Sequence, residues 1–557
     1  MKKTLLFFLW LAGGAGVLFG AAEARSGAPG TLRLDKAAFM IDSRGKMKVN
    51  ARGCDAGNLT WTSSDESVAA VSRNGVVTGV SAGDAVITAT TPEGATARCV
   101  ASVDYRGQNP LFPPTWGLFI ADGEPHVLDG KMWLFGSRDV VDGFLPNGQR
   151  DWCSTDYHAV YSEDLVHWVD AGVIITIDDI PADLRRGVGR LWAPDLFKSP
   201  TEKDKYYLTF CGNGKPLFIA ESSAPEGPFG NVRLITCDGK PITEIDPGTL
   251  VDDDGKVYIA TPKFHIGRLD PDDYSRILPD TYRSVLDSMP VDNEPFEGPS
   301  LRKRDGMYYY IYIQNKGNIR RDGAVPTLMG YMTSENPLGP YAYRGVVVSN
   351  YDYPGSGNIH GSIEKFRGRW YVAYHMPVPG LSLTRQPHMD CLEFDRDGGI
   401  RPVIPTSSGV RGAFGAGEKI RSSSGIVYSG GRTDRRAETR RAPTDNPYVF
   451  RFTDYPYTFY DEAGQWIGYR YLDFPAKLSR VDLSVCTQSG GGVLEIRRGS
   501  PSGEIVSRIP LPDTRGGWRT VASAASSGRK GRDAFYIVLS EAPQHGDVKV
   551  DWLSFIR

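Results

Sequence analysis

The chain contains the stretch Asp129-Gly130-Lys131-Met132-Trp133, a tight turn that leads into an aromatic strand. Similar phrases recur at residues 203–207, 254–258, 305–309 and 367–371, and their last residues lie 74, 51, 51 and 62 positions apart. This loose period is typical of the blades of a β-propeller, each of about 40 to 50 residues. The five phrases therefore predict five blades.

Five strongly functional side chains stand eleven or twelve residues before the last residues of these phrases. In a propeller the innermost strand of each blade starts near the central axis, so we expect the five positions to be equivalent and to converge on one face of the channel. Carboxylates gathered there repel one another and are costly to desolvate, which a core packed only for stability would avoid. The alternative is that they are N-caps, turn formers or salt-bridged channel residues. The five side chains are Asp122, Asp195, Asp246, Glu297 and His360.

The composition is that of a turn-rich, mostly β protein. Of 557 residues, 40% are apolar and 11% aromatic, and there are 64 glycines and 38 prolines. The length predicts three or four domains. A net charge of −2 gives no electrostatic reason to expect a nucleic-acid partner. We predict an all-β chain.

The N-terminus has the pattern of a secretory signal peptide over residues 1–24. Two lysines precede an apolar run over residues 4–19, and Ala22-Glu23-Ala24 offers a cleavage site. No later apolar stretch approaches the 18 residues of a membrane span. We therefore expect an exported, soluble protein without a transmembrane segment, located in the periplasm or outside the cell.

The seven cysteines are too sparse for a disulfide scaffold, and none has metal-binding spacing. Cys54 and Cys99 could pair in an oxidising compartment, whereas the others are expected to be small buried residues.

Residues 30–105 alternate apolar and polar side chains between glycine turns, for example in Val76-Val77-Thr78-Gly79-Val80. This segment resembles a bacterial Ig-like domain of group 2. The resemblance implies a β-sandwich that serves as a spacer or adhesion unit, without chemistry of its own.

Residues 108–408 carry one motif in each predicted blade. These are Ala121-Asp122-Gly123-Glu124-Pro125, Trp192-Ala193-Pro194-Asp195, Ile245-Asp246-Pro247, Phe296-Glu297-Gly298-Pro299-Ser300 and His360-Gly361-Ser362. Taken in order, they resemble glycoside hydrolase family 43, which implies a five-bladed β-propeller glycosidase. The base motif differs from the commoner Asp-Pro form, since Gly123 and a second acidic residue, Glu124, follow Asp122.

The resemblance implies a catalytic trio. Asp122 matches the general base, Asp246 the carboxylate that orients the acid and raises its pKa, and Glu297 the general acid. Inverting hydrolysis needs a protonated and an ionised carboxyl group about 6.5 to 9.5 Å apart, which opposite walls of a propeller can provide. Glu294 is a competitor for the acid role, although the Glu-Gly-Pro-Ser context favours Glu297.

Four further residues have roles implied by the same resemblance. Trp192 and Asp195 border the sugar site, with Trp192 able to stack on a sugar or to pack in the core. Arg385 faces the substrate, or forms a salt bridge that closes the last blade on the first. His360 lies near a channel metal, which could be a structural calcium, or is a hydrogen-bonded core residue. The chemistry itself requires no cofactor.

Residues 409–557 resemble a family 6 carbohydrate-binding module, a jelly-roll sandwich. Such modules open with a Glu-rich strand that helps to bind calcium, but this chain has Glu418-Lys419-Ile420-Arg421 there, which puts that metal site in doubt. We expect Trp518 and Trp552 to pack in the core, whereas Trp466 and Tyr469 could stack on sugar or belong to the sandwich.

The leading hypothesis is an exported, exo-acting α-L-arabinofuranosidase that trims plant-type polysaccharide by inversion and binds glycan through its C-terminal module. A β-xylosidase or exo-β-galactosidase of the same fold is the nearest rival. A non-catalytic glycan-binding surface protein is the alternative from another class, and the retention of three mutually repelling carboxylates argues against it.

Overall fold

The computed structural model describes residues 31–53, 58–140, 152, 154–213, 216–285, 295–315, 327–349, 359–378, 381–429, 448–450 and 457–557. These residues form strands, turns and short 3₁₀ helices but no α-helix, which confirms the all-β prediction. No helix within these ranges is long and apolar enough to cross a membrane. The predicted signal peptide, Cys54 and Glu294 lie outside the described residues, while Cys99 is buried as a free thiol.

Five sheets follow one another along the middle of the chain, and their strands pair antiparallel except for the parallel pair of β18 with β23 in the third sheet. The first contains β10 (Ile120–Leu128), β11 (Lys131–Arg138), β12 (Asp156–Ser162) and β13 (Trp168–Thr176). The second contains β14 (Leu191–Lys198), β15 (Tyr206–Gly212), β16 (Leu217–Ser222) and β17 (Gly230–Leu234). The third contains β18 (Thr236–Cys237), β19 (Lys240–Pro241), β20 (Gly248–Val251), β21 (Val257–Thr261), β22 (His265–Asp270), β23 (Asp273–Ile277) and β24 (Arg283–Ser284). The fourth contains β25 (Pro295–Arg304), β26 (Met307–Asn315), β27 (Thr327–Ser334) and β28 (Ala342–Ser349), and the fifth β29 (Gly361–Phe366), β30 (Arg369–Val378) and β31 (Leu381–Leu392).

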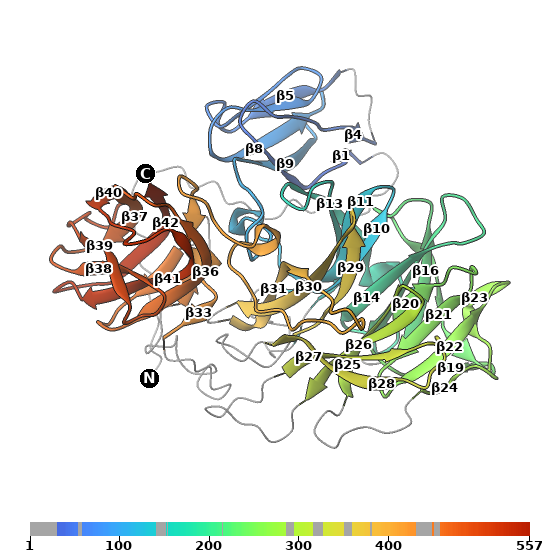
Figure 1. Ribbon diagram of the computed structural model, residues 1–557. Helices are drawn as coiled ribbons and strands as arrows, with labels where there is room; N and C mark the ends of the chain where they lie inside the picture. The colour runs from blue at the N-terminus through green and yellow to red at the C-terminus, as the bar shows by residue number, and fades with distance from the viewer. Residues whose placement is uncertain are drawn as a thin grey trace, which may run out of the picture.

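The five sheets close into a ring. The innermost strand of each sheet contacts the innermost strand of the next sheet. These strands form the cycle β10, β14, β20, β25, β29 and back to β10 (Figure 1). Each repeated phrase of the sequence covers the turn that follows the innermost strand of one sheet and the start of the next strand. The predicted five-bladed propeller is confirmed, and the ends of its inner strands surround a common axis.

The N-terminal domain is joined to the first blade by main-chain hydrogen bonds. Its strand β2 (Ala38–Ile41) pairs with β13, with Phe39 opposite Val169 and Ala38 opposite Asp170. The sheet of the first blade thus continues into the N-terminal domain, whose strand order beyond β2 is β9, β8 and β5. The remaining strands of the domain and their bounds are β1 (Arg33–Leu34), β3 (Lys46–Lys48), β4 (Ala51–Arg52), β5 (Thr60–Ser63), β6 (Ala69–Val71), β7 (Val76–Gly79), β8 (Gly83–Thr90) and β9 (Thr96–Val103).

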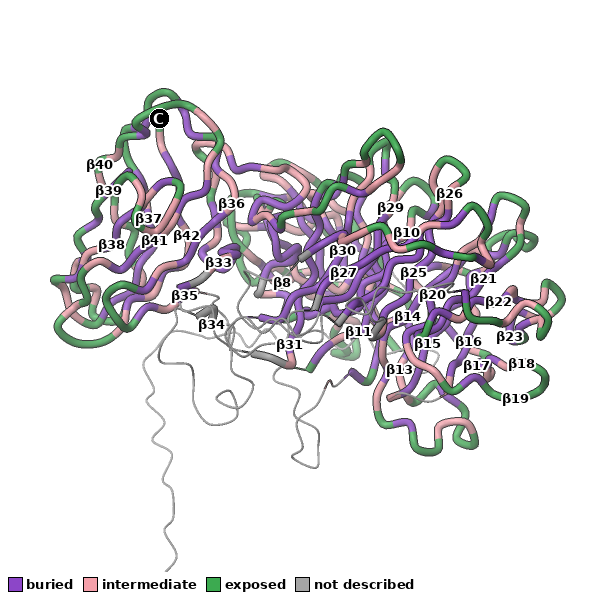
Figure 2. Tube along the Cα trace, turned by 60° about the horizontal axis from the view of Figure 1, so that its bottom comes forward, coloured by how far each residue is buried: buried purple, intermediate pink, exposed green. Residues whose placement is uncertain are grey.

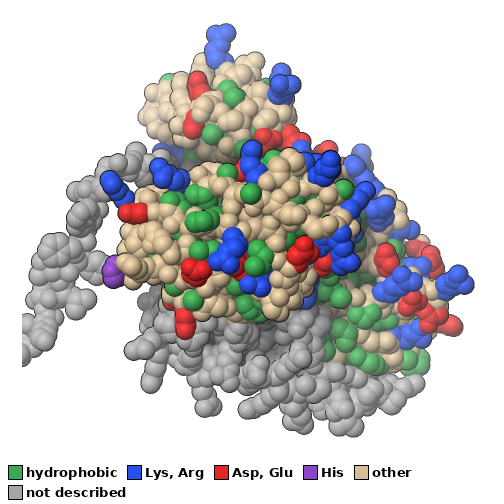
Figure 3. Space-filling view, turned by 60° about the vertical axis from the view of Figure 1, so that its left-hand side comes forward, with side chains coloured by type: hydrophobic (Ala, Val, Ile, Leu, Met, Phe, Trp, Pro, Cys, Tyr) green, Lys and Arg blue, Asp and Glu red, His purple; other side chains and the backbone are tan. Residues whose placement is uncertain are grey.

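The C-terminal module consists of two sheets packed face to face, and the buried inner faces stand out in Figure 2. One sheet contains β32 (Ile420–Arg421), β34 (Tyr448–Phe450), β35 (Tyr457–Tyr460), β37 (Arg480–Thr487), β40 (Arg519–Ala524) and β42 (Val548–Ile556). The other contains β33 (Val427–Tyr428), β36 (Trp466–Phe474), β38 (Val493–Arg498), β39 (Glu504–Pro510) and β41 (Gly531–Glu541). In the face that Figure 3 shows, acidic and basic side chains lie interspersed on this module.

The segment that follows the N-terminal domain also contacts the C-terminal module. Arg421 donates from Nη2 to the Pro110 carbonyl at 3.0 Å and from Nη1 to the Phe112 carbonyl at 3.3 Å. Its guanidinium lies 4.0 Å from the ring centroid of Tyr105. Gln108 donates to the Lys419 carbonyl at 3.0 Å. These contacts fix the C-terminal module against the chain that enters the propeller.

Candidate active site

Strand pairing aligns the five blades and corrects one prediction. To compare the blades, we choose one reference residue on the innermost strand of each. It is the residue that pairs with the position two residues after the end of the repeated phrase. Asp122, Asp246 and His360 lie two residues before their references, whereas Glu297 lies three before it and Asp195 is itself a reference. The predicted equivalence of the five side chains is therefore wrong for Glu297 and Asp195. The references are Glu124, Asp195, Gly248, Ser300 and Ser362.

The error for Asp195 arises from the length of one turn. Val127 pairs with Met132 in the first blade, and the corresponding pair in the second blade is Lys198 with Tyr206. The connection in the second blade is three residues longer, so a count back from the repeated phrase ends too far along the strand. Asp195 consequently lies two positions later along its inner strand than Asp122 does along its own, at the level of Glu124.

A β-bulge in the inner strand re-aims the side chains at the Asp122 position. The ladder shifts register between Ala121 and Glu124 in the first blade and at the corresponding places in the second and fourth. Asp122, which lies in the bulge of the first blade, has a φ angle of 55°, in the left-handed region that non-glycine residues rarely adopt. Asp246 has a φ angle of 48° as well, although its blade has no bulge at this place. Such bulges commonly turn a side chain out of the ladder beside a functional site.

Asp122 is buried, and four groups surround its carboxylate. Arg385 Nη1 donates to Oδ1 at 2.8 Å, and Ser137 Oγ donates to Oδ2 at 2.9 Å. The Nδ1 atoms of His360 and His375 lie 3.3 and 3.4 Å from Oδ1. Burial alone raises the pKa of a carboxyl group, but the charge of Arg385 and the hydrogen bond from His360 outweigh it and hold the pKa of Asp122 well below its usual value. The group is ionised at neutral pH.

Asp246 and Glu297 have raised pKa values. Asp246 accepts a hydrogen bond from the Gly298 amide at 3.2 Å, and burial raises its pKa to about 6. Glu297 is partly exposed; burial, and next the negative charge of Asp246, raise its pKa to about 8. At pH 7 the three carboxyl groups therefore divide into a protonated Glu297 and ionised Asp122 and Asp246. One proton donor and one proton acceptor are what general acid–base chemistry requires.

Arg385 joins the fifth blade to the first. Its Nε and Nη2 atoms donate to the two carboxylate oxygens of Asp139 at 2.9 and 2.8 Å, and its backbone amide donates to Asp139 Oδ2 at 2.8 Å. Its remaining Nη1 reaches Asp122. The residue thus makes the inter-blade salt bridge that was one reading of the sequence, and it also holds Asp122. Asp139 was missed, because no repeated pattern marks a residue that follows β11.

Two tryptophans lie beside this pair. The Arg385 guanidinium is 4.3 Å from the ring centroid of Trp152, and Trp192 Nε1 donates to the Trp152 carbonyl at 3.2 Å. Trp192 is partly exposed and packs against the core between the second and third blades. The sequence analysis did not single out Trp152, which lies in the connection between β11 and β12, outside every repeated phrase.

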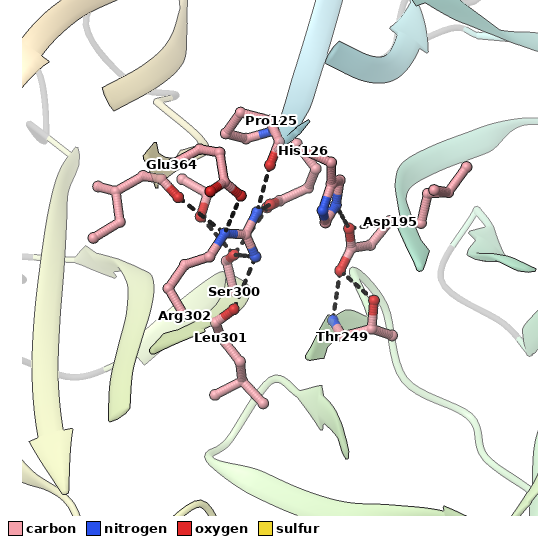
Figure 4. Close-up of polar contacts among 12 residues, drawn as sticks. Pro125, His126, Asp195, Thr249, Ser300, Leu301, Arg302 and Glu364 are labelled. Carbon is pink, nitrogen blue, oxygen red and sulfur yellow. Dashed lines mark hydrogen bonds and ion pairs between the residues drawn. The ribbon is translucent and has the colours of Figure 1, made fainter. Parts of the chain in front are cut away.

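Asp195 is enclosed by donors and has no exposed surface. Its Oδ2 accepts from the backbone amide and the hydroxyl of Thr249, and its Oδ1 lies 2.6 Å from His126 Nε2 (Figure 4). Its side chain is therefore not open to a ligand in this arrangement, and its predicted contact with the substrate stays a prediction. Within the described residues, one group has the ligand types of a metal site: Glu124, His126 and Asp195, whose ligand atoms lie within 4.8 Å of one another.

His360 is buried against Asp122 rather than within that group. Its ring also leaves no room for a side chain at residue 298, since a Cβ there would lie 2.9 Å from His360 Nε2. Gly298 has a φ of 66°, so both the space and the backbone conformation require glycine. The hydrogen-bonded reading of His360 accounts for these contacts, and its predicted proximity to a channel metal stays a prediction.

The aromatic residues of the C-terminal module differ in exposure. Tyr469 is fully buried and stacks on Phe535 with centroids 4.7 Å apart, so it belongs to the core. Trp466 is partly exposed and lies edge-on to Tyr536. Trp518 and Trp552 are also partly exposed, contrary to their predicted core positions, and the ring centroids of Trp518 and Tyr457 lie 5.6 Å apart.

Comparison with protein-family models gives three matches. Residues 144–400 match "Glycosyl hydrolases family 43", residues 454–557 match "Carbohydrate binding module (family 6)", and residues 35–101 match "Bacterial Ig-like domain (group 2)". The three matches follow one another in the order that the sequence resemblances predict.

Curated relatives carry glycosidase names. An arabinoxylan arabinofuranohydrolase of Bacillus subtilis (strain 168) is 27% identical over 475 residues, covering 77% of this chain and 88% of the relative. A xylosidase/arabinosidase of Thermoclostridium stercorarium is 30% identical over 344 residues, covering 54% of this chain and 67% of the relative. Among solved structures, a glycoside hydrolase family 43 arabinoxylan arabinofuranohydrolase from Bacillus subtilis, in complex with cellotetraose, covers 79% of this chain and 96% of its own, with 24% identity and a TM-score of 0.42.

Proposed function

Because the chain belongs to the glycosyl hydrolases of family 43, we propose that it is an exported, exo-acting α-L-arabinofuranosidase that removes side chains from plant-type polysaccharide with inversion of configuration. The chain is a glycoside hydrolase, it carries a family 6 carbohydrate-binding module, and the chemistry needs no cofactor. The observation that carries the proposal is that Asp122, Asp246 and Glu297 meet at the inner ends of three blades, where Arg385 and His360 contact Asp122 and the Gly298 amide beside Glu297 donates to Asp246.

The arabinofuranoside preference is supported by the extent of the matches. The two relatives named arabinoxylan arabinofuranohydrolase align over 475 and 458 residues, which cover 77% and 75% of this chain. The relatives named xylosidase/arabinosidase align over 335 to 348 residues, about half of this chain. A β-xylosidase is therefore the second candidate.

In the proposed reaction, Glu297 donates its proton to the glycosidic oxygen as the bond to the anomeric carbon breaks. Asp122 accepts a proton from a water molecule, whose oxygen forms the new bond to the opposite face of that carbon. Asp246 keeps Glu297 protonated until the sugar is bound. Arg385 fixes the orientation of Asp122, and Trp192 and Trp152 offer aromatic faces for the sugar.

We expect the protein to hydrolyse an aryl α-L-arabinofuranoside faster than the matching β-D-xyloside or β-D-galactoside, and to release arabinose from arabinoxylan. Proton NMR during the first minutes should show the β-anomer of arabinose, since a single displacement inverts the α-configuration. Faster turnover of the xyloside would assign the β-xylosidase instead. Glycan binding without turnover of any substrate would favour the non-catalytic alternative.

The pH dependence should follow Glu297. Its pKa of about 8 means that the acid loses its proton as the pH rises through that value, so kcat/KM should fall on the alkaline side near pH 8. Asp246→Asn removes the neighbouring negative charge, lowers the pKa of Glu297 and should move this limb to lower pH. Glu393→Gln, at an exposed site, is the matched control and should leave the limb in place. A limb that does not move in Asp246→Asn would exclude Asp246 as the group that raises this pKa.

A further inference from the structure

The interior of the ring below the carboxylates contains the donor set of a cation site. Glu124, His126 and Asp195 come from β10 and β14, and Glu364 of β29 lies beside the guanidinium of Arg302 (Figure 4). Calcium in such a place would need six to eight oxygen ligands at about 2.3 to 2.6 Å. Whether the residues fit calcium depends on what already occupies these oxygens.

Arg302 of β25 occupies them. Its Nη2 donates to Glu124 Oε2 and to the Pro125 carbonyl, both at 2.9 Å. Its Nη1 donates to Ser300 Oγ at 3.1 Å and to the Leu301 carbonyl at 2.8 Å. The guanidinium is buried, so the carbonyl and carboxylate oxygens that a hard cation would use already accept from a fixed positive charge.

The same guanidinium reaches a third blade. Arg302 Nε donates to the Ile363 carbonyl at 2.9 Å and lies 3.6 Å from Glu364 Oε2. Ser300 also hydrogen-bonds Ser362 and Glu124, which adds neutral links between the same blades. Arg302 therefore ties β10, β25 and β29 together, as a central metal ion would.

Asp195 is also saturated. Its two oxygens accept from the Leu196 amide, from the amide and hydroxyl of Thr249, and lie against His126. A calcium ion bound here would have to displace these donors and lie close to the Arg302 charge. The group of Glu124, His126 and Asp195 therefore does not fit a calcium ion.

The C-terminal module shows the same replacement at its own expected calcium strand. Glu418 Oε2 accepts from Arg411 Nη1, and Glu418 Oε1 accepts from the Gly415 amide at 2.9 Å. The neighbouring Lys419 places its ammonium 4.7 Å from the ring centroid of Trp552. Here too a side-chain cation holds the carboxylate.

We propose that Arg302 is the built-in structural cation of the propeller, and Arg411 that of the C-terminal module, so that the chain folds and is stable without calcium. A guanidinium supplied by the chain cannot dissociate. The propeller would then keep its stability in calcium-poor or chelating surroundings, where a metal-held ring loses its central ion.

The first test uses the wild-type protein. After dialysis against EDTA, the melting temperature should agree within about 1 °C between EDTA and millimolar CaCl₂, and calcium titration by calorimetry should give no binding heat. A site with micromolar affinity would instead raise the melting temperature by about 5 °C or more at this concentration. Loss of stability in EDTA that calcium restores would overturn the proposal. These readouts do not depend on the substrate, so they stand apart from the proposed activity.

The second test removes the cation. Arg302→Ala leaves Glu124 and Glu364 without their cationic partner, so the melting temperature should fall by about 5 to 8 °C. Low millimolar guanidinium, well below denaturing concentrations, should recover part of the loss. Arg401→Ala is the matched control, because Arg401 also pairs with two carboxylates but is exposed. Equal stability of the two variants would contradict the proposal, and if Arg302→Ala does not fold, the wild-type calcium titration decides alone.

Discussion

Glu297→Gln is expected to lower kcat/KM on arabinoxylan by about 10³- to 10⁴-fold, because the amide cannot donate a proton to a poor leaving group. Glutamine has nearly the same size and no charge, and Glu297 is itself uncharged at pH 7, so the substitution should leave the melting temperature almost unchanged. The measurement is steady-state kinetics on arabinoxylan and on a series of aryl arabinofuranosides.

The aryl series separates an acid from a merely structural residue. A dinitrophenolate leaves without protonation, so the variant should retain most of its activity on that substrate while it loses activity on the polysaccharide. Glu393→Gln, an exposed carboxylate on the same chain, should behave as the wild type on both. A uniform loss across the series would argue that Glu297 does not protonate the leaving group.

Asp122→Asn is expected to lower kcat by about 10²- to 10⁴-fold for every leaving group, because the step that fails is activation of the water. The asparagine oxygen can still accept from Arg385 while its amide nitrogen donates to the Ser137 hydroxyl, and Asp139 continues to hold the guanidinium. The loss should therefore appear in kcat more than in KM.

Asp129→Asn provides the control for this variant, since Asp129 lies in the exposed turn that follows the same strand. It should leave the kinetics unchanged. If the activity of Asp122→Asn recovers with a better leaving group, the roles assigned to Asp122 and Glu297 would have to be exchanged.

The blades were predictable because their signal is local. A turn followed by an aromatic strand is encoded within five residues, and each such phrase forms the predicted turn in the structure. The carboxylates of the trio were also predictable, since each precedes a phrase by one strand length.

The register was not predictable from the same count. Turn lengths and bulges differ between blades, and a difference of three residues moved Asp195 to a different level of the ring. Only the hydrogen-bond ladder shows which residues of different blades share a level.

The long-range partners were beyond the sequence for another reason. Arg385 meets Asp139 across 246 positions, and Arg302 meets Glu124 across 178. Closure of the ring creates these contacts, and no local pattern shows which residues of different blades will meet. The sequence indicates only on which face of its strand Arg302 lies, because strand alternation places it on the same side as Ser300.

The pairing of β13 with β2 bears on the order in which the chain acquires structure. A chain emerges from the ribosome or from a translocation channel N-terminus first, and domains generally fold as units in that order. The N-terminal sandwich ends at β9, about 65 residues before β13 emerges, so β2 can present a finished edge when the first blade forms. That edge gives the outermost strand of the first blade a partner before the other four blades exist, and it occupies an edge that could otherwise pair with a second chain.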